Sequence, residues 1–302
     1  MDNVGFIGLG SMGRGMMANL ANNGVAVLAF DIDAAALQAA TGPSVSQAEN
    51  VATVGRDCKR IILSLPDGEV VEEGLFGAGN MASALSPGAI IVDTSTTHAR
   101  KSQEFAERLA TQDVRFLDAP VTGMETRAAD GTLTIMVGGD AAAFEAVRPL
   151  LEHMGTTVVH MGPPGSGQLT KMVNNVLYNI SVAAMAEMLP LAARLGLDPQ
   201  AIRRVVGSGS GQSFGFDYFA ERVLAGRFHE GYPMGKAFKD MLAISEHANA
   251  LKAPMPVVSG ALQTYRQALA EGYGDEAKGA MIKVWERVLG VDLTGSNPTG
   301  GN

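Results

Sequence analysis

The 302-residue sequence predicts an α/β protein in which a doubly wound, mostly parallel sheet is followed by an all-α domain. Three observations predict this fold class. A short apolar segment near the N-terminus runs into a glycine-rich turn and then into a helix-forming segment. Short apolar segments then alternate with helix-forming ones as far as residue 162, as in repeated βα units. Beyond the turn cluster Gly162–Gly167, almost every segment has helical composition.

The composition and net charge indicate a globular protein and argue against several other classes of protein. Hydrophobic residues make up 46% and charged residues 18% of the chain, which is typical of a globular protein. The net charge of −8 argues against a nucleic-acid surface, which needs clustered Lys and Arg. No uninterrupted apolar run reaches the ~18 residues of a membrane span, and a strand that begins by residue 4 leaves no room for a secretory or transit segment. We therefore expect a cytoplasmic protein with no nucleic-acid and no membrane partner.

The single cysteine and the five histidines indicate neither a disulfide, nor a nucleophilic thiol, nor a metal site. Cys58 cannot form an intrachain disulfide, which fits a reducing cytoplasm. It lies just before an apolar run and is expected to be a structural or incidental thiol rather than a nucleophile. The histidines lack metal-ligand spacing, so the sequence predicts no metal site.

The glycine-rich turn follows the apolar strand Val4–Ile7 and precedes the helix expected over Arg14–Asn22. Gly8 permits a tight turn, Gly10 lets the backbone approach a pyrophosphate, and Gly13 lets the helix pack close to the strand. Free N–H groups and the positive dipole at the helix start would hold the phosphate charge. The sequence thus predicts a Rossmann-type dinucleotide site. Its candidate cofactor-binding residues are Gly8, Leu9, Gly10, Ser11, Met12 and Gly13.

Asp31 is the candidate ribose ligand. It ends the second apolar strand, Val25–Phe30, and follows Gly8 by 23 residues, close to the spacing of a ribose-binding acid. A carboxylate there accepts hydrogen bonds from the ribose hydroxyls of NAD and repels the 2′-phosphate of NADP, so NAD is favoured over NADP. The alternative is a solvated aspartate that caps the next helix, a position that Asp33 could also fill.

Further elements continue the alternation. Strands are expected at 60–66, 89–93, 114–118, 132–137 and 157–159, and helices at 97–112 and 140–153. Ligands of such sheets bind beyond the carboxyl ends of the strands. The polar segments expected at those ends are Leu65-Pro66, Asp93–Thr96 and Asp118–Gly123.

We place the domain boundary after residue 162, with a dinucleotide domain at 1–162 and a helical domain at 163–302. A long interdomain helix is expected over Gln168–Leu195, where only Pro190 could cause a kink. Asp198-Pro199 is a helix start, and Gly207–Gly211 is a flexible loop. Three further helices are expected near 236–251, 256–271 and 275–289, and the polar tail 294–302 is expected to be disordered.

Hydride transfer between an alcohol and a carbonyl needs a group that handles the hydroxyl proton. No Ser, Tyr and Lys set has short-chain-dehydrogenase spacing. Lys171 lies in the first turns of the long helix, where partial desolvation and an oxidised nicotinamide would favour loss of its proton. Asn175 follows four residues later and projects from the same helix face. The alternative is a surface lysine with a capping asparagine.

Four segments in order make the sequence similar to the β-hydroxyacid dehydrogenase family, whose members include 3-hydroxyisobutyrate dehydrogenase and tartronate semialdehyde reductase. Gly5–Gly13 matches the cofactor segment, and Asp118–Gly123 matches the substrate segment, normally D-A-P-V-S-G-G. Gly167–Asn175 matches the catalytic G-x-x-x-K-x-x-x-N segment. Phe238–Met241 resembles the K-D-L segment of the second domain.

The resemblance implies which residues meet the substrate. Lys171 would be the general acid/base, and Asn175 would hold the substrate or orient Lys171. Backbone N–H groups and a hydroxyl of Thr122 and Gly123 would bind the substrate carboxylate. Lys239 would lie over the active site, near both cofactor and substrate. Without the family, Lys239 and its neighbour would be interpreted as a solvated pair on a helix surface.

The resemblance also implies cofactor contacts and an assembly. Leu65 and Pro66 would line the adenosine side of NAD, and Thr96 would bond near the nicotinamide ribose. The C-terminal domain would be like that of 6-phosphogluconate dehydrogenase. Because the helical domains of the family pack against one another, a homodimer or homotetramer is expected.

One departure from the family lies in the substrate segment. Met124 stands where the family has a second glycine, which removes conformational freedom and fills space next to the substrate. The stretch Met124–Asp130 otherwise aligns with a small, glycine-rich loop of the family. Our hypothesis is a substrate whose acidic end or side chain differs from the common ones. Arg127 would contact its anionic group, or else point to solvent. The Gly207–Gly211 loop with Phe214 is a second candidate wall of the pocket.

The sequence thus predicts an NAD-dependent oxidoreductase that interconverts a small anionic β-hydroxyacid, similar to 3-hydroxyisobutyrate, and its semialdehyde or keto form. Two other classes stay open. Related imine reductases share the fold but usually replace the lysine, so Lys171 argues against them. A non-catalytic NAD-binding sensor would have a degraded catalytic segment, whereas Lys171 and Asn175 are both present.

Overall fold

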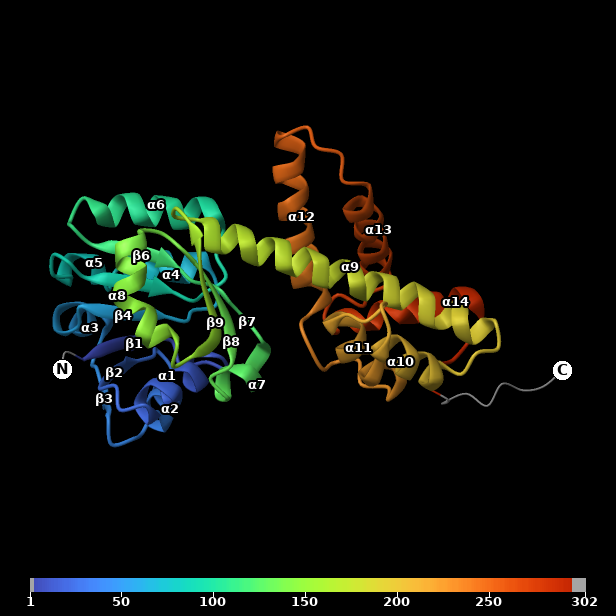
Figure 1. Cartoon of the computed structure of the whole chain (residues 1–302), viewed down its shortest axis with the longest axis horizontal. Helices are drawn as coiled ribbons and strands as arrows, with labels where there is room; N and C mark the ends of the chain where they lie inside the picture. Colours follow the sequence, from blue (N-terminus) through green and yellow to red (C-terminus); the bar gives the residue numbers. More distant parts are fainter. Residues whose placement is uncertain (1–2, 295–302) are drawn as a thin grey trace. The chain divides into compact units, whose positions relative to one another are not determined.

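The computed structural model describes residues 3–294 and divides the chain into two compact units, residues 1–171 and 172–302 (Figure 1). The tail expected to be disordered lies outside the described residues, apart from Thr294. The division falls inside the long helix, and the sequence-based domain boundary after residue 162 stays a prediction.

The first unit is built around one sheet, which confirms the predicted α/β class. Within residues 3–294 it contains nine strands in the order β3-β2-β1-β4-β5-β6-β8-β7, with β9 paired to β8. Strands β1 to β6 pair in parallel, β8 is antiparallel to β6 and β7, and β9 is parallel to β8. The strands are β1 Val4–Ile7, β2 Val27–Phe30, β3 Val45–Gln47, β4 Arg60–Leu63, β5 Ile90–Asp93, β6 Arg115–Asp118, β7 Val121–Thr122, β8 Leu133–Gly138 and β9 Gly155–Gly162.

The pairing register of the parallel strands places the carboxyl ends of the central strands at the same edge of the sheet. Ile7 of β1 pairs with Leu63 of β4, Leu63 with Asp93 of β5, and Asp93 with Asp118 of β6. The three polar segments expected from the sequence therefore follow neighbouring strands at the same edge. The expected strand 60–66 ends earlier, at Leu63, and Asp67 caps a helix over Gly68–Phe76 that was not predicted.

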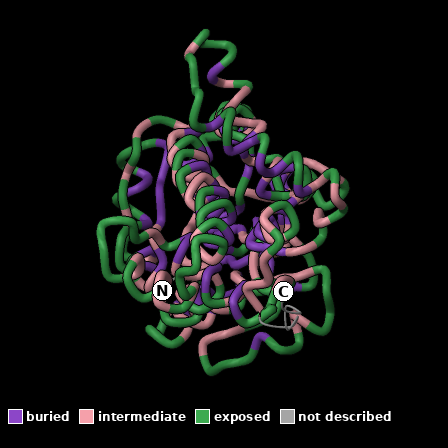
Figure 2. The backbone as a smooth tube through the Cα atoms, turned by 90° about the vertical axis from the view of Figure 1, so that its right-hand side faces the viewer, coloured by how far each residue is buried: buried purple, intermediate pink, exposed green. Residues whose placement is uncertain are grey.

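Helices cover both faces of the sheet, so its strands are mostly buried (Figures 1 and 2). One apolar core lies under α1 and α8, and its members include Phe6, Met16, Leu20, Leu117, Phe144 and Val147. The other lies under α4 and α6, and its members include Ile61, Val71, Leu75, Phe105 and Leu109. The helices are α1 Gly13–Asn22, α2 Ala34–Ala39, α3 Val51–Asp57, α4 Gly68–Phe76, α5 Met81–Ala84, α6 Ala99–Ala110, α7 Met124–Ala129 and α8 Ala141–Leu151.

The second unit is helical. Its elements are α9 Ser166–Arg194, which begins in the first unit, α10 Pro199–Ser208, α11 Phe214–Leu224, α12 Met234–Ala250, α13 Pro256–Ala270, the 3₁₀ helix η1 Lys278–Met281 and α14 Ile282–Leu289. Asp198 caps α10 and Pro199 occupies its first turn, as predicted. The helix continues through Gly207 and Ser208, so the expected loop there is shorter.

Two further expectations for this unit need correction. Helix α11 has no counterpart among the predicted helices, because the glycines before it and the aromatic residues within it conceal its helical pattern. The helix expected at 275–289 starts as the 3₁₀ turn η1. Pro190 lies inside α9, and the helix continues through it.

The core of the second unit contains a buried lysine. Lys278 has 1% of its surface exposed. Its ammonium donates to Asn179 Oδ1 at 2.6 Å and lies 3.2 Å from the ring centroid of Tyr178. Asn179 in turn donates to the Ala237 carbonyl, so this network ties α9 to η1 and α12.

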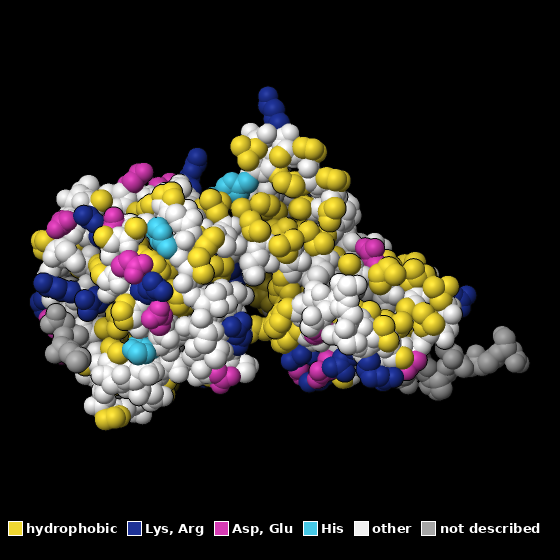
Figure 3. Space-filling model, in the orientation of Figure 1, with side chains coloured by type: hydrophobic (Ala, Val, Ile, Leu, Met, Phe, Trp, Pro, Cys, Tyr) yellow, Lys and Arg dark blue, Asp and Glu magenta, His cyan; other side chains and the backbone are white. Residues whose placement is uncertain are grey.

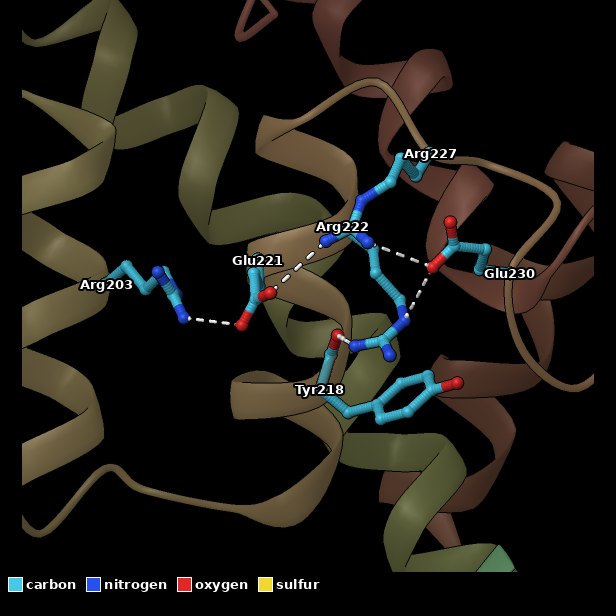
Figure 4. Close-up of polar contacts among 6 residues, drawn as sticks. All are labelled: Arg203, Tyr218, Glu221, Arg222, Arg227 and Glu230. Carbon is cyan, nitrogen blue, oxygen red and sulfur yellow. Dashed lines mark hydrogen bonds and ion pairs between the residues drawn. The ribbon is translucent and has the colours of Figure 1, made fainter. Parts of the chain in front are cut away.

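Alternating charges connect α10, α11 and the segment after α11 (Figure 4). Glu221 pairs with Arg203 at 2.8 Å and with Arg227 at 3.2 Å. Glu230 pairs with Arg227 at 3.2 Å and with Arg222 at 3.5 Å. The Arg222 guanidinium also lies 3.5 Å from the ring centroid of Tyr218 and donates to its carbonyl. Such half-exposed pairs each stabilise only weakly, and the Arg203–Glu221 pair is the one among them that joins α10 to α11.

One described helix, α9, is long and apolar enough to cross a membrane, with an 18-residue window of mean hydropathy 1.5. Small polar residues interrupt this window, so it does not stand out in the sequence as an unbroken apolar run. The window is 44% buried inside the fold, and core helices of soluble proteins pass the same test.

Candidate functional site

The glycine turn of the first unit has the geometry of an anion cradle. Gly8 has φ +96°, a left-handed conformation that favours glycine, and a Cβ there would overlap the Ser64 carbonyl. A Cβ on Gly13 would overlap the Gly8 carbonyl, so α1 packs tightly on the turn. Around Gly10, in contrast, a Cβ would meet no atom within 4 Å. Helix α1 begins with no side-chain cap and no acidic residue in its first turn, which leaves its N-terminus suited to a phosphate.

The Asp31 carboxylate is held beside this turn. It accepts hydrogen bonds from the N–H of Leu9 at 2.5 Å and the N–H of Asp33 at 2.8 Å. Asp33, not Asp31, is the N-cap of α2. A carboxylate has about four acceptor positions, so Asp31 keeps capacity for the hydroxyls of a ribose.

At the neighbouring strand ends, a buried serine connects the two segments that follow β4 and β5. Ser95 Oγ accepts from the Leu65 N–H at 2.9 Å, and the Ser95 N–H donates to Asp93 Oδ1 at 3.0 Å. Thr96 and Pro66 are exposed at this edge, and Leu65 is half-buried. The predicted cofactor residues therefore lie together at the carboxyl edge of the sheet, next to the glycine turn.

A strand carboxylate caps the start of α9. Asp118, at the end of β6, accepts from the Gly165 N–H at 2.7 Å and from the Gln168 N–H at 2.9 Å. The Gln168 side chain bonds to the Ser95 carbonyl at 2.8 Å and to the Thr97 N–H at 3.0 Å. A Cβ on Gly167 would overlap the Met136 carbonyl, so the helix approaches the sheet as closely as glycine allows. These bonds fix the first turn of α9, and Lys171 projects from the next turn.

Two buried carboxylates adjoin in this network. Burial raises the pKa of Asp93 to about 7, while hydrogen bonds from Ser95 and Thr97 lower it and the charge of Asp118 raises it. Burial also raises the pKa of Asp118, against the opposing hydrogen bonds from the backbone of Gly165 and Gln168. Both side chains cap backbone N–H groups, which indicates that they position the edge rather than take part in the chemistry.

Lys171 reaches the predicted substrate segment. Its ammonium donates to the Val121 carbonyl at 2.8 Å, and the residue is half-buried. Val121 and Thr122 form β7, which pairs with Ile135 and Thr134 of β8. The structure thus brings Lys171 next to Thr122 and Gly123 within the first unit.

The departure at Met124 has a backbone consequence. Gly123 has φ +141° and Met124 has φ +63°, so the methionine adopts a left-handed conformation that few bulky residues adopt. The stretch that begins at Met124, expected to be a loop, forms the short helix α7. The aliphatic part of Arg127 packs over Gly123, because a Cβ on that glycine would lie 2.8 Å from Arg127 Cβ and 2.9 Å from its Cδ. Arg127 is half-buried and its aliphatic part lies against Gly123, and the choice between an anion contact and solvent for its guanidinium stays a prediction.

In the second unit, Asn175 donates to Asp240 Oδ2 at 3.2 Å, which connects α9 to α12. Lys239 precedes that aspartate on α12 and is exposed. Phe214 begins α11, is exposed, and has its ring 5.6 Å from that of Tyr178. Among described residues there is no group of three or more His, Cys, Asp or Glu side chains that could hold a metal ion.

The residues that position the site carry little signal in the sequence. Sequence reasoning does not single out Ser95 or Gln168, and it gives Asp118 only as part of a motif. A polar residue at a strand end is common, and the partners of these side chains are up to 73 residues away.

Comparison with known proteins decides the family. The family model of the NAD binding domain of 6-phosphogluconate dehydrogenase matches residues 3–162, and that for NAD-binding of NADP-dependent 3-hydroxyisobutyrate dehydrogenase matches residues 165–285. The chain belongs to the β-hydroxyacid dehydrogenase family. The resemblance inferred from the four sequence segments is thereby confirmed.

Relatives with assigned activities span almost the whole chain. The 2-(hydroxymethyl)glutarate dehydrogenase of Eubacterium barkeri is 36% identical over 97% of this chain and 97% of its own length. The L-threonate dehydrogenase of Escherichia coli is 33% identical, again over 97% of both chains. The solved 3-hydroxyisobutyrate dehydrogenase of Salmonella typhimurium, 29% identical, superposes with a TM-score of 0.84 and covers 94% of this chain and 100% of that one. This member of the family is therefore an oxidoreductase of the hydroxyacid dehydrogenase type with dinucleotide-binding domains.

Proposed function

We propose that this β-hydroxyacid dehydrogenase uses NAD to oxidise a small anionic β-hydroxyacid, with Lys171 as the general acid/base. The observation that carries the proposal is the 2.8 Å hydrogen bond from the Lys171 ammonium to the Val121 carbonyl. It sets the one lysine of the catalytic segment against the segment that would bind the substrate carboxylate. The first turn of α9, directly before the turn that carries this lysine, is fixed by Asp118.

NAD fits the residues of the glycine turn. The open space at Gly10 and the uncapped start of α1 would receive the pyrophosphate, with Leu9, Ser11 and Met12 lining the turn. Asp31 would accept the ribose hydroxyls and repel a 2′-phosphate, which supports NAD over NADP. Leu65, Pro66 and Thr96 follow neighbouring strands at the same edge, where the rest of the cofactor would extend.

NAD supplies a hydride acceptor when it is bound. Neutral Lys171 would take the proton of the substrate hydroxyl at its Nζ while the adjacent C–H bond breaks, and would return that proton in the reverse direction. Thr122 and Gly123 would hold the substrate carboxylate. Asn175, held by Asp240, would bind the substrate or orient the lysine, and Lys239 would add a positive charge near both ligands.

We propose that the Met124 side chain limits which hydroxyacid the enzyme accepts as its substrate. The relatives are named for 2-(hydroxymethyl)glutarate, L-threonate and 3-hydroxyisobutyrate, so related chains serve acids of different size and charge. A methionine side chain beside Gly123 reduces the space available. We infer that the enzyme prefers an acid that differs from its relatives' substrates at the end nearest Met124, with Arg127 near its anionic group.

The test is reduction of NAD⁺, with NADP⁺ in parallel, over a panel of hydroxyacids. The panel contains 3-hydroxyisobutyrate, L-threonate, 2-(hydroxymethyl)glutarate, glycerate, serine and a sulfonate analogue. A preferred acid with NAD⁺ supports the proposal, and a preference for NADP⁺ contradicts the assignment of Asp31. NAD⁺ binding without turnover of any acid would instead favour a cofactor-binding sensor.

Replacement of Lys171 by methionine tests the mechanism. The variant keeps the length of the side chain and loses the proton acceptor, so kcat should fall by about 10²–10⁴-fold while NAD binding is unchanged. Lys59→Met is the matched control, because Lys59 precedes β4 at the opposite edge of the sheet. Retained turnover in Lys171→Met would contradict the proposed role.

We further propose a cytoplasmic homodimer or homotetramer. Exposed apolar side chains along α9 support an assembly through the helical unit, since such a stripe is unfavourable in water.

A further inference from the structure

Helix α1, which follows the glycine turn, also packs against α7. Gly15 of α1 faces the backbone at the end of α7, and a Cβ there would lie 2.9 Å from the carbonyl carbon and oxygen of Ala128 and 2.9 Å from the Ala129 nitrogen. Any side chain at this position would push the two helices apart. The contact is therefore between backbones, and Ala128 is completely buried in it.

Asn19 lies one turn further along α1 and holds α7 by hydrogen bonds. Its Nδ2 donates to the Ala128 carbonyl at 2.8 Å and to the Ala129 carbonyl at 3.2 Å, and it also donates to the Gly15 carbonyl at 3.0 Å. The last carbonyls of a helix have no partner within the helix. A side chain from α1 thus serves as the C-terminal cap of α7.

We propose that Asn19, together with Gly15, is a positioning residue that fixes the substrate segment 121–129 on the cofactor-binding helix. The start of this segment is held by the β7–β8 pairing and by Lys171 at the Val121 carbonyl. Its other end is held by Asn19. Between these two anchors lies Met124 with its left-handed backbone, and such a conformation persists only where the surroundings fix both sides.

Asn19 acts through α7 and not by contact with the ligands. It lies six residues beyond Gly13, roughly 9 Å along the helix from the turn that would bind the cofactor. The effect on substrate rests on the proposed function, whereas the docking of α7 on α1 can be measured without it. The test therefore has a kinetic arm and a structural arm.

The kinetic arm compares Asn19→Ala with Asn23→Ala. Asn23 lies just beyond the same helix, and its Nδ2 donates to the Asn19 carbonyl at 2.8 Å rather than to α7, so it is a matched control. In Asn19→Ala, KM for the preferred hydroxyacid should rise about tenfold as the hydrogen bonds are lost, while the dissociation constant of NAD⁺ stays within about twofold of the wild-type value. Asn23→Ala should change neither. Equal changes in NAD⁺ affinity and KM, or no change in either, would overturn the proposal.

Asn19→Asp keeps the shape of the side chain and replaces its amide N–H donor with a carboxylate oxygen. Its carboxylate would face the carbonyl oxygens of Ala128, Ala129 and Gly15, so its KM should exceed that of Asn19→Ala. If this variant does not fold, the comparison of Asn19→Ala with Asn23→Ala decides the kinetic arm.

The structural arm measures amide hydrogen exchange of residues 124–132 in the same proteins. Exchange there should accelerate in Asn19→Ala and stay unchanged in Asn23→Ala, with the rest of the first unit unaffected. Faster exchange throughout that unit would show that Asn19 serves general stability and would overturn the proposal. Should no hydroxyacid be oxidised by the wild type, the proposed function fails, and the exchange data still decide whether Asn19 docks α7.

Discussion

Met124 shows how one residue can combine backbone strain with a place in the substrate segment. Its φ of +63° costs a side-chain-bearing residue about 1–2 kcal/mol, and glycine adopts it freely. The strain lies next to Gly123 and follows closely on Val121, whose carbonyl accepts from Lys171. A bulky residue in such a strained backbone conformation is a reason to test Met124 for a role in function.

The variants Met124→Gly and Met124→Ala separate strain from side-chain size. Met124→Gly should keep or raise the free energy of unfolding, by up to about 1 kcal/mol, because relief of strain exceeds the extra entropy of the unfolded chain. Met124→Ala keeps the strain and should be less stable than Met124→Gly. Both should accept bulkier hydroxyacids than the wild type does. Thermal unfolding and the substrate panel provide the measurements, and an unchanged substrate preference in both variants would exclude Met124 from specificity.

Asp93 should make stability depend on pH. Its pKa of about 7 in the folded protein exceeds the ordinary value of 3.8, so the folded state binds more protons than the unfolded state between these values. The free energy of unfolding should therefore fall as the pH rises from about 4 to about 7, by roughly 1.4 kcal/mol for each pH unit across this range. Chemical denaturation across this range should show a smaller decline in Asp93→Asn. An equal decline in both proteins would assign it to other groups.

Among the elements, the first turn of α9 is the part of the site that depends most on tertiary packing. It is held by a carboxylate from β6 and by the absence of a side chain at Gly167. Gly167 and Gln168 of this turn are buried against the sheet. A small shift at its start would move Lys171 relative to the substrate segment.

Gly167→Ala should therefore reduce kcat, by about 10–100-fold, because the new Cβ would overlap the carbonyls of Met136 and Asp118. Gly260→Ala is the control, since Gly260 lies within α13 and an added Cβ would meet no atom within 4 Å. The control should keep its activity and gain about 1 kcal/mol in stability. Equal activity in both variants would show that the position of the α9 start is not critical.

At the scale of the whole molecule, one face of α9 is apolar and is not covered by other helices of its own unit. Val173, Leu177 and Met188 are 51%, 65% and 57% exposed. Apolar side chains gather on the surface of the helical unit over this helix (Figure 3). A second copy of the chain is the partner proposed for this face.

Charged residues introduced on this face of α9 should weaken the proposed association between copies of the chain. Leu177→Glu together with Met188→Glu should shift the protein toward the monomer in light scattering, while Arg204→Glu on the exposed side of α10 should not. The reason is that a carboxylate buried in an interface without a partner costs several kcal/mol. An unchanged molar mass in the double variant would place the interface elsewhere.

Much of the fold could be predicted because its signals are local. The glycine turn, the short apolar strands and the cap Asp198 lie in the segments that they organise. Of the candidate site, the cofactor turn and the catalytic segment carry residue types at fixed spacing. Their contacts with ligands stay predictions, because motifs specify chemistry without specifying a substrate.

The α/β class, the alternation of the main strands and helices along the first unit and the family all follow from the amino-acid sequence, whereas the short elements β3, β7, α3, α4, α5 and α7 were not predicted. Tertiary packing was needed to show that α7 replaces a loop, that Asp118 caps α9, that Met124 is left-handed and that Asn19 holds α7. The difference lies in the range of the interactions. Periodicity and turn chemistry act between near neighbours, whereas a buried polar group finds its partner wherever packing brings one, here 50 residues away for Asp118 and Gln168 and 109 for Asn19 and Ala128.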